Sequence, residues 1–199
     1  MKDEIFESYK NCSLNYIGNS NSLHELGLNS RKIEDAAGKQ ILDILGLNNK
    51  EIVYTSGNAE SYTLIIENID DNKNIVTDNK ALYDVCVEMG KNVKFGDVKK
   101  LIDDKTALIS TFNFYSFNNY NGLIHVDISN NYRPLLSNDI DFITIEDDIP
   151  FFGCLIKNKN KELLPIIHGG KSTTKYRSGT TPTPLIVSFS KLIRFKYKK

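Results

Sequence analysis

The apolar positions of the chain fall into short strand-like runs that alternate with helix-like patterns. The runs that predict strands cover residues 51–55, 74–77, 92–95, 106–111, 123–127 and 141–145. Apolar residues at helical spacing separate the first four runs and predict helices over 58–69, 79–89 and 97–103. Because strands that alternate with helices form a mostly parallel sheet covered on both faces, the pattern predicts an α/β protein. Its ligands are expected at the carboxyl ends of the strands.

The segment before the first strand predicts two helices joined by a polar loop. Residues 2–10 are amphipathic, and residues 11–29 are rich in Asn and Ser. A long helix is predicted to begin after Ser30, a good N-cap residue, and to end at Gly46. Its apolar residues recur at helical spacing.

The last quarter of the chain is basic and contains one further strand. The run FGCLIK, residues 152–157, predicts a strand that joins the sheet in the antiparallel direction, and the polar stretch KNKNKE follows it. The ending KLIRFKYKK suits either a nucleic-acid-binding tail or the solvated end of a helix. The second interpretation is favoured because five apolar residues predict a core or interface contact: Val187, Phe189, Leu192, Ile193 and Phe195.

Length and composition limit the class of protein. The 199 residues, with 40% hydrophobic and 25% charged, predict a single folded domain over residues 1–199. No apolar run is long enough to span a membrane and no signal peptide is recognisable, so a cytoplasmic protein without membrane or nucleic-acid partners is expected. Three widely spaced cysteines indicate reduced thiols rather than disulfides or a zinc site.

The net charge of zero hides an asymmetry. Residues 1–150 carry 14 Lys and Arg against 24 Asp and Glu, a net charge of −10, whereas residues 151–199 carry 11 against 1, a net charge of +10. Such a division does not by itself identify a partner.

Two strand ends carry candidate binding residues. The turn Ser56-Gly57-Asn58 joins a strand to a helix, where free backbone N–H groups can bind a phosphate or can simply be capped. Asp127 ends the run LIHVD, where its carboxylate can hold a cationic ring nitrogen or cap the next turn. The three histidines have no metal-ligand spacing, and we recognise neither a metal site nor a catalytic triad. The cluster from Tyr176 to Thr180 can bind an anion or brace a loop.

Taken in order, these motifs resemble the large domain of the NifS-like cysteine desulfurases, a branch of the class V aminotransferase fold. GNSNSLHELG resembles the family's "GNPSSxHxxG", and EIVYTSGNAESYTLII resembles "EIxFTSGxTExxNLAI". IHVDISN resembles "HVDxxQ", and PIIHGGKSTTKYRSGTTPTPLIVSF resembles "PxxxGGxQExxxRSGTxxxxxIVxF". The resemblance implies a three-layer α/β/α domain with a mostly parallel sheet, and it implies that the family's opening strand and C-terminal domain are missing.

The resemblance also implies a pyridoxal 5'-phosphate site, from which this sequence departs. The family's serine-x-histidine-lysine follows the strand resembling DFITI, and Glu146-Asp147-Asp148-Ile149 stands there. Isoleucine cannot form a Schiff base, so no cofactor and no catalytic residue is expected. The ring-stacking histidine corresponds to Asn79 and the phosphate-binding threonine to Ala59, while the ring-oxygen asparagine falls near Tyr115 or Ser116.

Some binding positions are retained. The resemblance implies vestigial cofactor-binding roles for five residues: Gly57, Asn58, Asp127, Asn130 and Thr180. Thr180 matches a threonine that reaches the neighbouring subunit's phosphate in family dimers. Cys154 lies in an apolar run and is expected to be an inert thiol. Lys157 and Lys171 are not expected to reach the place of the cofactor ring.

The expected function is therefore that of an inactive desulfurase-like protein that binds another protein, as a homodimer or as a heterodimer with a desulfurase-like partner. The alternative is a pyridoxal-phosphate-dependent desulfurase subunit completed by a separately encoded partner. Two other interpretations stay open: an anion- or nucleotide-binding module that uses the Ser56-Gly57-Asn58 turn, and a decaying gene product.

Overall fold

The structure is a computed structural model that describes residues 2–113, 117, 120–129, 139–147, 149, 152–170, 172 and 174–197. Its strands are β1 (Lys50–Thr55), β2 (Asn74–Thr77), β3 (Val93–Phe95), β4 (Thr106–Thr111), β5 (Leu123–Asp127), β6 (Phe142–Glu146) and β7 (Gly153–Asn158). Its helices are α1 (Lys2–Asn15), α2 (Glu25–Leu45), α3 (Asn58–Glu67), α4 (Lys80–Glu88), α5 (Val98–Leu101) and α6 (Thr183–Tyr197).

All of these strands form one sheet in the order β1-β7-β6-β5-β4-β2-β3. The pairs β3/β2, β2/β4, β4/β5 and β5/β6 are parallel. Strand β7 lies between β6 and β1 and is antiparallel to both, so the expected antiparallel strand is confirmed. The predicted α/β class with a mostly parallel sheet is confirmed as well.

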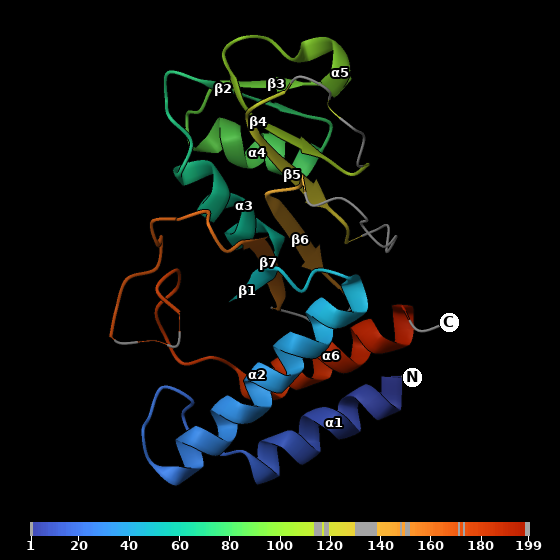
Figure 1. Ribbon diagram of the computed structural model, residues 1–199, viewed down its shortest axis with the longest axis vertical. Coiled ribbons are helices and arrows are strands. Elements are labelled where there is room, and N and C mark those ends of the chain that lie inside the picture. The colour runs from blue at the N-terminus through green and yellow to red at the C-terminus, as the bar shows by residue number, and fades with distance from the viewer. Residues whose placement is uncertain are drawn as a thin grey trace.

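Helices cover both faces of the sheet (Figure 1). Helices α2 and α6 bury residues such as Ile41 and Phe189 against one face, and helix α3 buries residues such as Ile65 and Leu64 against the other. Helix α1 lies outside these layers and packs on α6. The carboxyl ends of the parallel strands thus lie on the same side of the sheet, next to the first turns of α3 and α4.

The first two helices extend further than the sequence pattern predicts. Helix α1 continues to Asn15 instead of ending at residue 10, and α2 begins at Glu25 rather than after Ser30. The N-cap is His24, whose Nδ1 accepts a hydrogen bond of 3.2 Å from the backbone N–H of Gly27. The prediction that Ser30 caps the helix is wrong, because a histidine supplies the acceptor one and a half turns earlier. Gly46 ends α2 in the left-handed conformation, as expected.

The C-terminal helix belongs to the core rather than to a solvated tail. Phe189, Leu192 and Ile193 of α6 are buried, and Val187 and Phe195 are half-buried. The prediction of core contacts is confirmed for Phe189, Leu192 and Ile193, and for Val187, which packs against the same core cluster. No helix among the described residues is both long enough and apolar enough to cross a membrane.

Candidate functional site

The buried carboxylate of Asp127 lies at the carboxyl end of β5 and is surrounded by hydrogen-bond donors. Only 2% of the residue is exposed. Its Oδ2 accepts hydrogen bonds from the hydroxyl of Tyr62, from Asn79 Nδ2 at 3.1 Å and from Asn58 Nδ2 at 3.3 Å. Its Oδ1 accepts one from the backbone N–H of Ser129 at 2.9 Å. Both oxygens are therefore engaged by groups of the chain itself.

Tyr62 is a residue of this network that the sequence motifs did not identify. It lies four residues after Asn58 in α3, so the two side chains point to the same side of the helix. Burial, together with the Asp127 carboxylate, raises the pKa of Tyr62, so the phenol remains a donor at neutral pH. Asn79, the N-cap of α4, donates from Nδ2 to the Tyr62 hydroxyl at 2.9 Å and accepts from the backbone N–H of Leu82. The helical spacing from Asn58 was the one signal available.

His125 lies beneath this network on β5 and is fully buried. Its Nδ1 hydrogen-bonds with Ser110 Oγ at 2.8 Å, and its Nε2 with Thr144 Oγ1 at 3.0 Å. Burial lowers the pKa of His125 to about 4, although the nearby Asp127 carboxylate acts in the opposite direction. The imidazole is therefore neutral at pH 7 and serves as a structural link between three neighbouring strands.

A second carboxylate lies at the start of α3, where the sequence predicts an anion site. Oε2 of Glu146, the last residue of β6, accepts a hydrogen bond of 2.7 Å from the backbone N–H of Asn58. Gly57, with φ 152°, allows this approach, because a Cβ there would lie 3.1 Å from Glu146 Oε2. Glu60 accepts from the backbone N–H of Ser56 at 2.8 Å. Two of the N–H groups at this helix start are thus satisfied by carboxylates of the chain.

Ser129 connects the two carboxylates. Its hydroxyl oxygen accepts hydrogen bonds from Asn58 Nδ2 at 2.8 Å and from the backbone N–H of Glu146 at 2.9 Å. The structure thus brings Gly57, Asn58 and Asp127 together at the carboxyl edge of the sheet. Asn130 and Asp148 lie outside the described residues.

Comparison with known proteins agrees with this fold. The model of the family "Aminotransferase class-V" matches residues 1–86. The cysteine desulfurase IscS of Rickettsia typhi is 26% identical over 225 residues, covering 88% of this chain and 54% of that protein. The mitosomal cysteine desulfurase of Trachipleistophora hominis is 27% identical, covering 87% of this chain and 51% of that protein.

Among solved structures, a NifS-like protein superposes with a TM-score of 0.83 at 22% identity, covering 97% of this chain and 66% of that one. The NifS-like protein from Rickettsia africae gives a TM-score of 0.84 at 19% identity, covering 98% of this chain and 65% of that one. In sequence and in fold the chain is similar to NifS-like cysteine desulfurases and to the class V aminotransferases. It spans about half the length of the curated desulfurases it matches.

The residue that the sequence resemblance matches to the family's cofactor lysine is apolar and buried. Ile149 is 9% exposed and belongs to the core cluster between the sheet, α2 and α6. Ala59, which the resemblance matches to the family's phosphate-binding threonine, has no hydroxyl and lies in the first turn of α3. Asn79, which the resemblance matches to the ring-stacking histidine, is the N-cap of α4.

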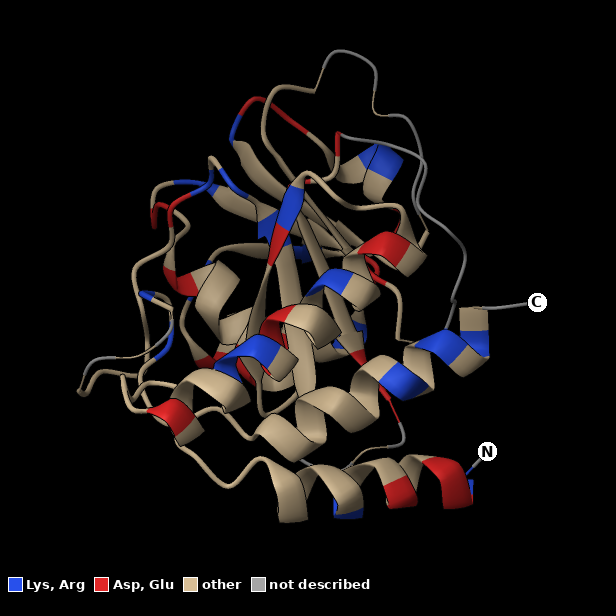
Figure 2. Cartoon of the chain, turned by 60° about the horizontal axis from the view of Figure 1, so that its bottom comes forward, with Lys and Arg blue, Asp and Glu red and all other residues tan. Residues whose placement is uncertain are grey.

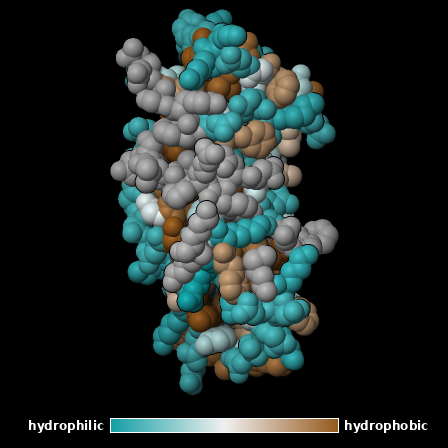
Figure 3. Space-filling view, turned by 90° about the vertical axis from the view of Figure 1, so that its right-hand side faces the viewer, coloured by the Kyte–Doolittle hydropathy of each residue, from teal (hydrophilic) through white to brown (hydrophobic). Residues whose placement is uncertain are grey.

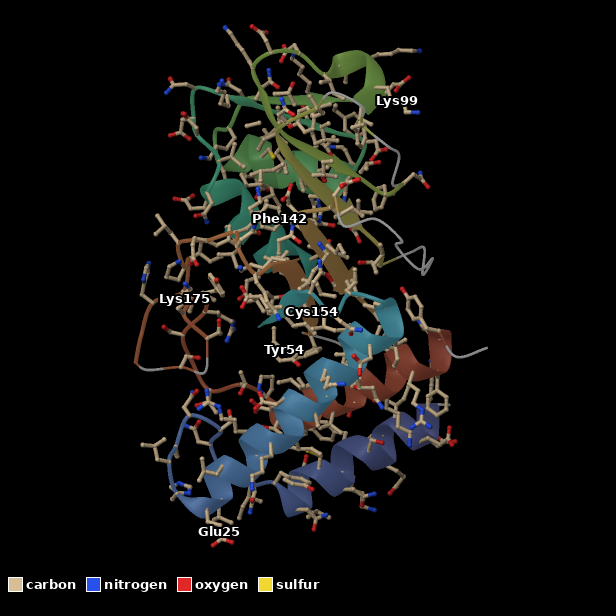
Figure 4. The ribbon with its side chains drawn as sticks, in the orientation of Figure 1. Glu25, Tyr54, Lys99, Phe142, Cys154 and Lys175 are labelled. Carbon is tan, nitrogen blue, oxygen red and sulfur yellow. The ribbon has the colours of Figure 1, made fainter. Side chains whose placement is uncertain are left out.

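The other candidate amine and thiol do not reach this site. Lys157 pairs in register with Phe142, the first residue of β6, whereas Asp127 is the last residue of β5. Its Nζ donates to Glu51 Oε1 at 2.5 Å. Cys154 on β7 is fully buried, and burial raises its pKa to about 12, as expected for an inert thiol (Figure 4). Lys171, Tyr115 and Ser116 lie outside the described residues.

Thr180 lies in a loop whose hydrogen bonds reach α2 and the segment before it rather than Asp127. Its Oγ1 accepts a hydrogen bond of 3.2 Å from Asn19 Nδ2. The neighbouring Thr181 donates at 2.8 Å to the buried Glu34 of α2, which also accepts from Thr183. The same loop reaches α3 through Arg177, whose Nε donates to Glu60 Oε1 at 2.7 Å.

The described residues do not fit pyridoxal phosphate. None of them places an amine beside Asp127, whose two oxygens are already engaged, and the helix start that would receive a phosphate holds the Glu146 carboxylate. Within the same described ranges, no group of three or more His, Cys, Asp or Glu side chains is arranged to bind a metal ion.

Proposed function

We propose that this chain is a catalytically inactive member of the cysteine desulfurase family that acts by binding another protein. The observation that carries the proposal is Ile149, a buried hydrocarbon side chain at the position of the cofactor lysine. An isoleucine cannot form the imine on which the family's chemistry depends. Without that covalent link, the chain has no means of holding the cofactor through a reaction cycle.

Electrostatics at the start of α3 supports the same proposal. The phosphate of the cofactor is a dianion, and it would have to displace or sit beside the Glu146 carboxylate. Two unit charges about 4 Å apart repel by roughly 1 kcal/mol even in water, and by more where the site is partly desolvated. The helix start that favours an anion is therefore already neutralised by the chain.

The hydrogen bonds that Asp127 already accepts are a third support for the proposal. In the family's chemistry a carboxylate at this place holds the protonated ring nitrogen of the cofactor. Here Tyr62, Asn79 and Asn58 all donate to the same oxygen of Asp127, Oδ2. Binding a ring nitrogen would require the loss of at least one of these buried hydrogen bonds, each worth about 1 kcal/mol or more.

The partner that we propose is another chain with the desulfurase fold, either a second copy or a complete desulfurase. Thr180 is exposed, and its loop is braced from behind by Thr181, Thr183 and Glu34. Such a loop can meet a partner in a fixed conformation. In a heterodimer, the Thr180 hydroxyl could complete the phosphate site of an active neighbour.

The test is to saturate the purified chain with pyridoxal phosphate and to record its absorption spectrum. We expect no yellow protein-bound band and no cysteine-dependent release of sulfide. A band that borohydride bleaches would overturn the proposal. Adding a complete desulfurase separates the two partner choices, because a mixed dimer changes the mass and activity of the desulfurase, whereas a strict homodimer leaves both unchanged.

A further inference from the structure

A cavity of about 290 Å³ lies between α2, β1 and the loop of residues 174–181. Its α2 wall is a single stripe of the helix, since Arg31, Asp35, Gly38 and Leu42 follow one another at intervals of three or four residues. The stripe is charged at Arg31 and Asp35 and apolar at Leu42, and Gly38 between them adds no side chain. The volume is close to the lower end of the range typical of ligand sites. We call this feature the α2–β1 cavity.

The β1 wall of the cavity is an unpaired edge of the sheet. Strand β1 stands at one end of the strand order, so within the described part of the chain only β7 pairs with it. The backbone N–H of Asn158, the last residue of β7, donates to the carbonyl of Asp141 just before β6. Because successive residues of a strand direct their backbone groups to opposite edges, the preceding residue of β7 faces β1, where its register partner is Glu51. The backbone N–H and C=O of Ile52 and Tyr54 therefore point to the free edge, and both residues line the cavity.

The side-chain hydroxyl of Tyr54 has no partner either. The ring packs on Phe152 with the centroids 5.8 Å apart, but the hydroxyl forms no hydrogen bond with any residue that the structure describes. It lies over α2 at Gly38, where a Cβ would be 2.8 Å from the oxygen. Burial raises the pKa of Tyr54, so the phenol remains a donor at neutral pH. This unused donor suits an acceptor oxygen of a ligand.

Most charged side chains of the cavity already have partners. The pairs are Glu34 with Thr181 and Thr183, Glu51 with Lys157, Lys50 with Asn158, and Arg177 with Glu60.

Arg31 and Asp35 are the two exceptions among the described residues of the cavity. Basic and acidic positions alternate along α2 (Figure 2), yet these two form no ion pair with each other. Asp35 is exposed, so water solvates its carboxylate, whereas Arg31 is half-buried. An unpaired charge costs more where it is partly removed from water. The cavity therefore favours an anionic group beside Arg31.

We propose that the α2–β1 cavity binds the C-terminal end of an extended peptide, which adds to the free edge of β1 and places its carboxylate at Arg31 and the Tyr54 hydroxyl. Addition of a strand to an open sheet edge is a recurrent mode of peptide recognition, because backbone hydrogen bonds supply the affinity. An apolar side chain of the peptide is expected near Leu42 and Ile52. The inference goes beyond the proposed function, since such binding requires neither an inactive cofactor site nor a partner with the desulfurase fold.

The direction of the peptide follows from the course of α2 and β1. The chain turns back between these two elements, so the apolar end of the α2 stripe lies beside the first residues of β1. Gly38 lies beside the Tyr54 hydroxyl, and Arg31 is about two helical turns farther from the start of β1. A carboxylate at Arg31 therefore requires a peptide that runs parallel to β1. In that pairing, one peptide residue donates its N–H to the Ile52 carbonyl and accepts from the Tyr54 N–H.

Peptide titrations test this site in the full chain. The probe is acetyl-Val-Thr-Leu with a free carboxylate, and it is compared by isothermal titration calorimetry with the same peptide as a C-terminal amide and with free leucine. The variants are Arg31→Gln and Tyr54→Phe, each checked by circular dichroism. Hydrogen exchange of the Tyr54 backbone amide, followed by NMR, reports on the edge of β1.

Arg194→Gln is the matched control, because Arg194 is exposed on the last turns of α6. The end of α6 lies away from the loop of residues 174–181 in Figure 1. It belongs to the side of the molecule that Figure 3 shows, where polar and apolar side chains are intermixed.

We expect the carboxylate peptide to bind and the amide to bind at least about tenfold more weakly, because the amide lacks the charge that Arg31 recognises. Arg31→Gln should weaken binding of the carboxylate peptide at least about tenfold and leave the amide unaffected. Tyr54→Phe should weaken it about fivefold, as expected for one neutral hydrogen bond. The control should behave as the wild type, and bound peptide should slow the exchange of the Tyr54 amide.

Absence of binding, equal affinities for the carboxylate and the amide, or unchanged exchange at Tyr54 would overturn the inference. So would an Arg31→Gln variant that binds both peptides as the wild type does. Free leucine bound as tightly as the peptide would show a site for small carboxylates and would overturn the peptide assignment. None of these results bears on the absorbance test, so the proposed inactivity and this binding site can fail separately.

Discussion

At the scale of single residues, Glu146 decides how the start of α3 is used. Its Oε2 lies 2.7 Å from the backbone nitrogen of Asn58, where a helix start would otherwise attract an anion from solution. We therefore predict that replacing this carboxylate creates an anion site. Glu146→Ser should be stabilised by inorganic phosphate, by about 1.4 kcal/mol at ten times its dissociation constant, whereas the wild type should not be.

Thermal unfolding of both proteins at constant ionic strength, with phosphate exchanged for chloride, measures this difference. Glu67→Ser at the last turn of α3 removes an equal charge away from the helix start and should leave the phosphate response at zero. An equal phosphate response in all three proteins would show that Glu146 does not govern the site.

The site residues were predictable from the sequence only in part. The turn at Gly57 and Asn58 and the strand end at Asp127 stand at positions where the β-α-β pattern itself predicts a site. Tyr62 could not be singled out, because an aromatic residue inside a helix normally contributes only apolar surface to the core. The acidic character at Glu146 was visible in the sequence, but its bond to the Asn58 N–H depends on how close β6 comes to α3.

At the scale of elements, one glycine of α2 leaves room for the end of a side chain from β1. A Cβ at Gly38 would lie 2.8 Å from the hydroxyl oxygen of Tyr54, whose side chain is labelled in Figure 4. Alanine is favoured over glycine within a helix by up to about 1 kcal/mol. Overpacking at a tight contact costs about 1–3 kcal/mol, however, so we predict that Gly38→Ala lowers the free energy of unfolding.

A double-mutant cycle isolates this contact. In the background of Tyr54→Phe, which lacks the hydroxyl, Gly38→Ala should be neutral or stabilising by up to about 1 kcal/mol. Urea unfolding gives the four free energies. If Gly38→Ala has the same effect with and without the hydroxyl, the close approach does not limit this position.

The limits of elements were harder to predict than their existence. Every strand predicted from the apolar runs is present, and most of these strands are buried parallel strands, which need an uninterrupted apolar segment. The start of α2 was misplaced, since its first turn exposes Leu26 and Leu28 and so lacks the one-sided pattern that reveals a packed helix. The cap is a histidine, which helix-start statistics do not favour.

At the scale of the whole molecule, the buried His125 makes stability depend on pH. Its pKa of about 4 in the fold lies below the value of about 6.5 for an exposed histidine, so the unfolded chain binds an extra proton between these values. Its contribution to stability is complete above pH 6.5 and is lost as the pH falls toward 4. The loss expected from this group is about 3 kcal/mol.

Urea unfolding between pH 4 and pH 7 tests this dependence. His125→Asn keeps a polar side chain near Ser110 and Thr144 but cannot titrate, so its free energy of unfolding should fall less steeply with decreasing pH. His168→Asn, in the exposed loop, is the matched control and should keep the wild-type slope. Identical slopes for the wild type and His125→Asn would contradict the assignment.

The most direct test of the central claim is a search for a covalent bond between this chain and the cofactor. The chain is incubated with pyridoxal phosphate and reduced with borohydride, and its intact mass and peptides are measured, with a complete cysteine desulfurase treated in parallel. The account predicts a single pyridoxyl group on the desulfurase and an unmodified mass for this chain. One pyridoxyl group at a single lysine of this chain would contradict it.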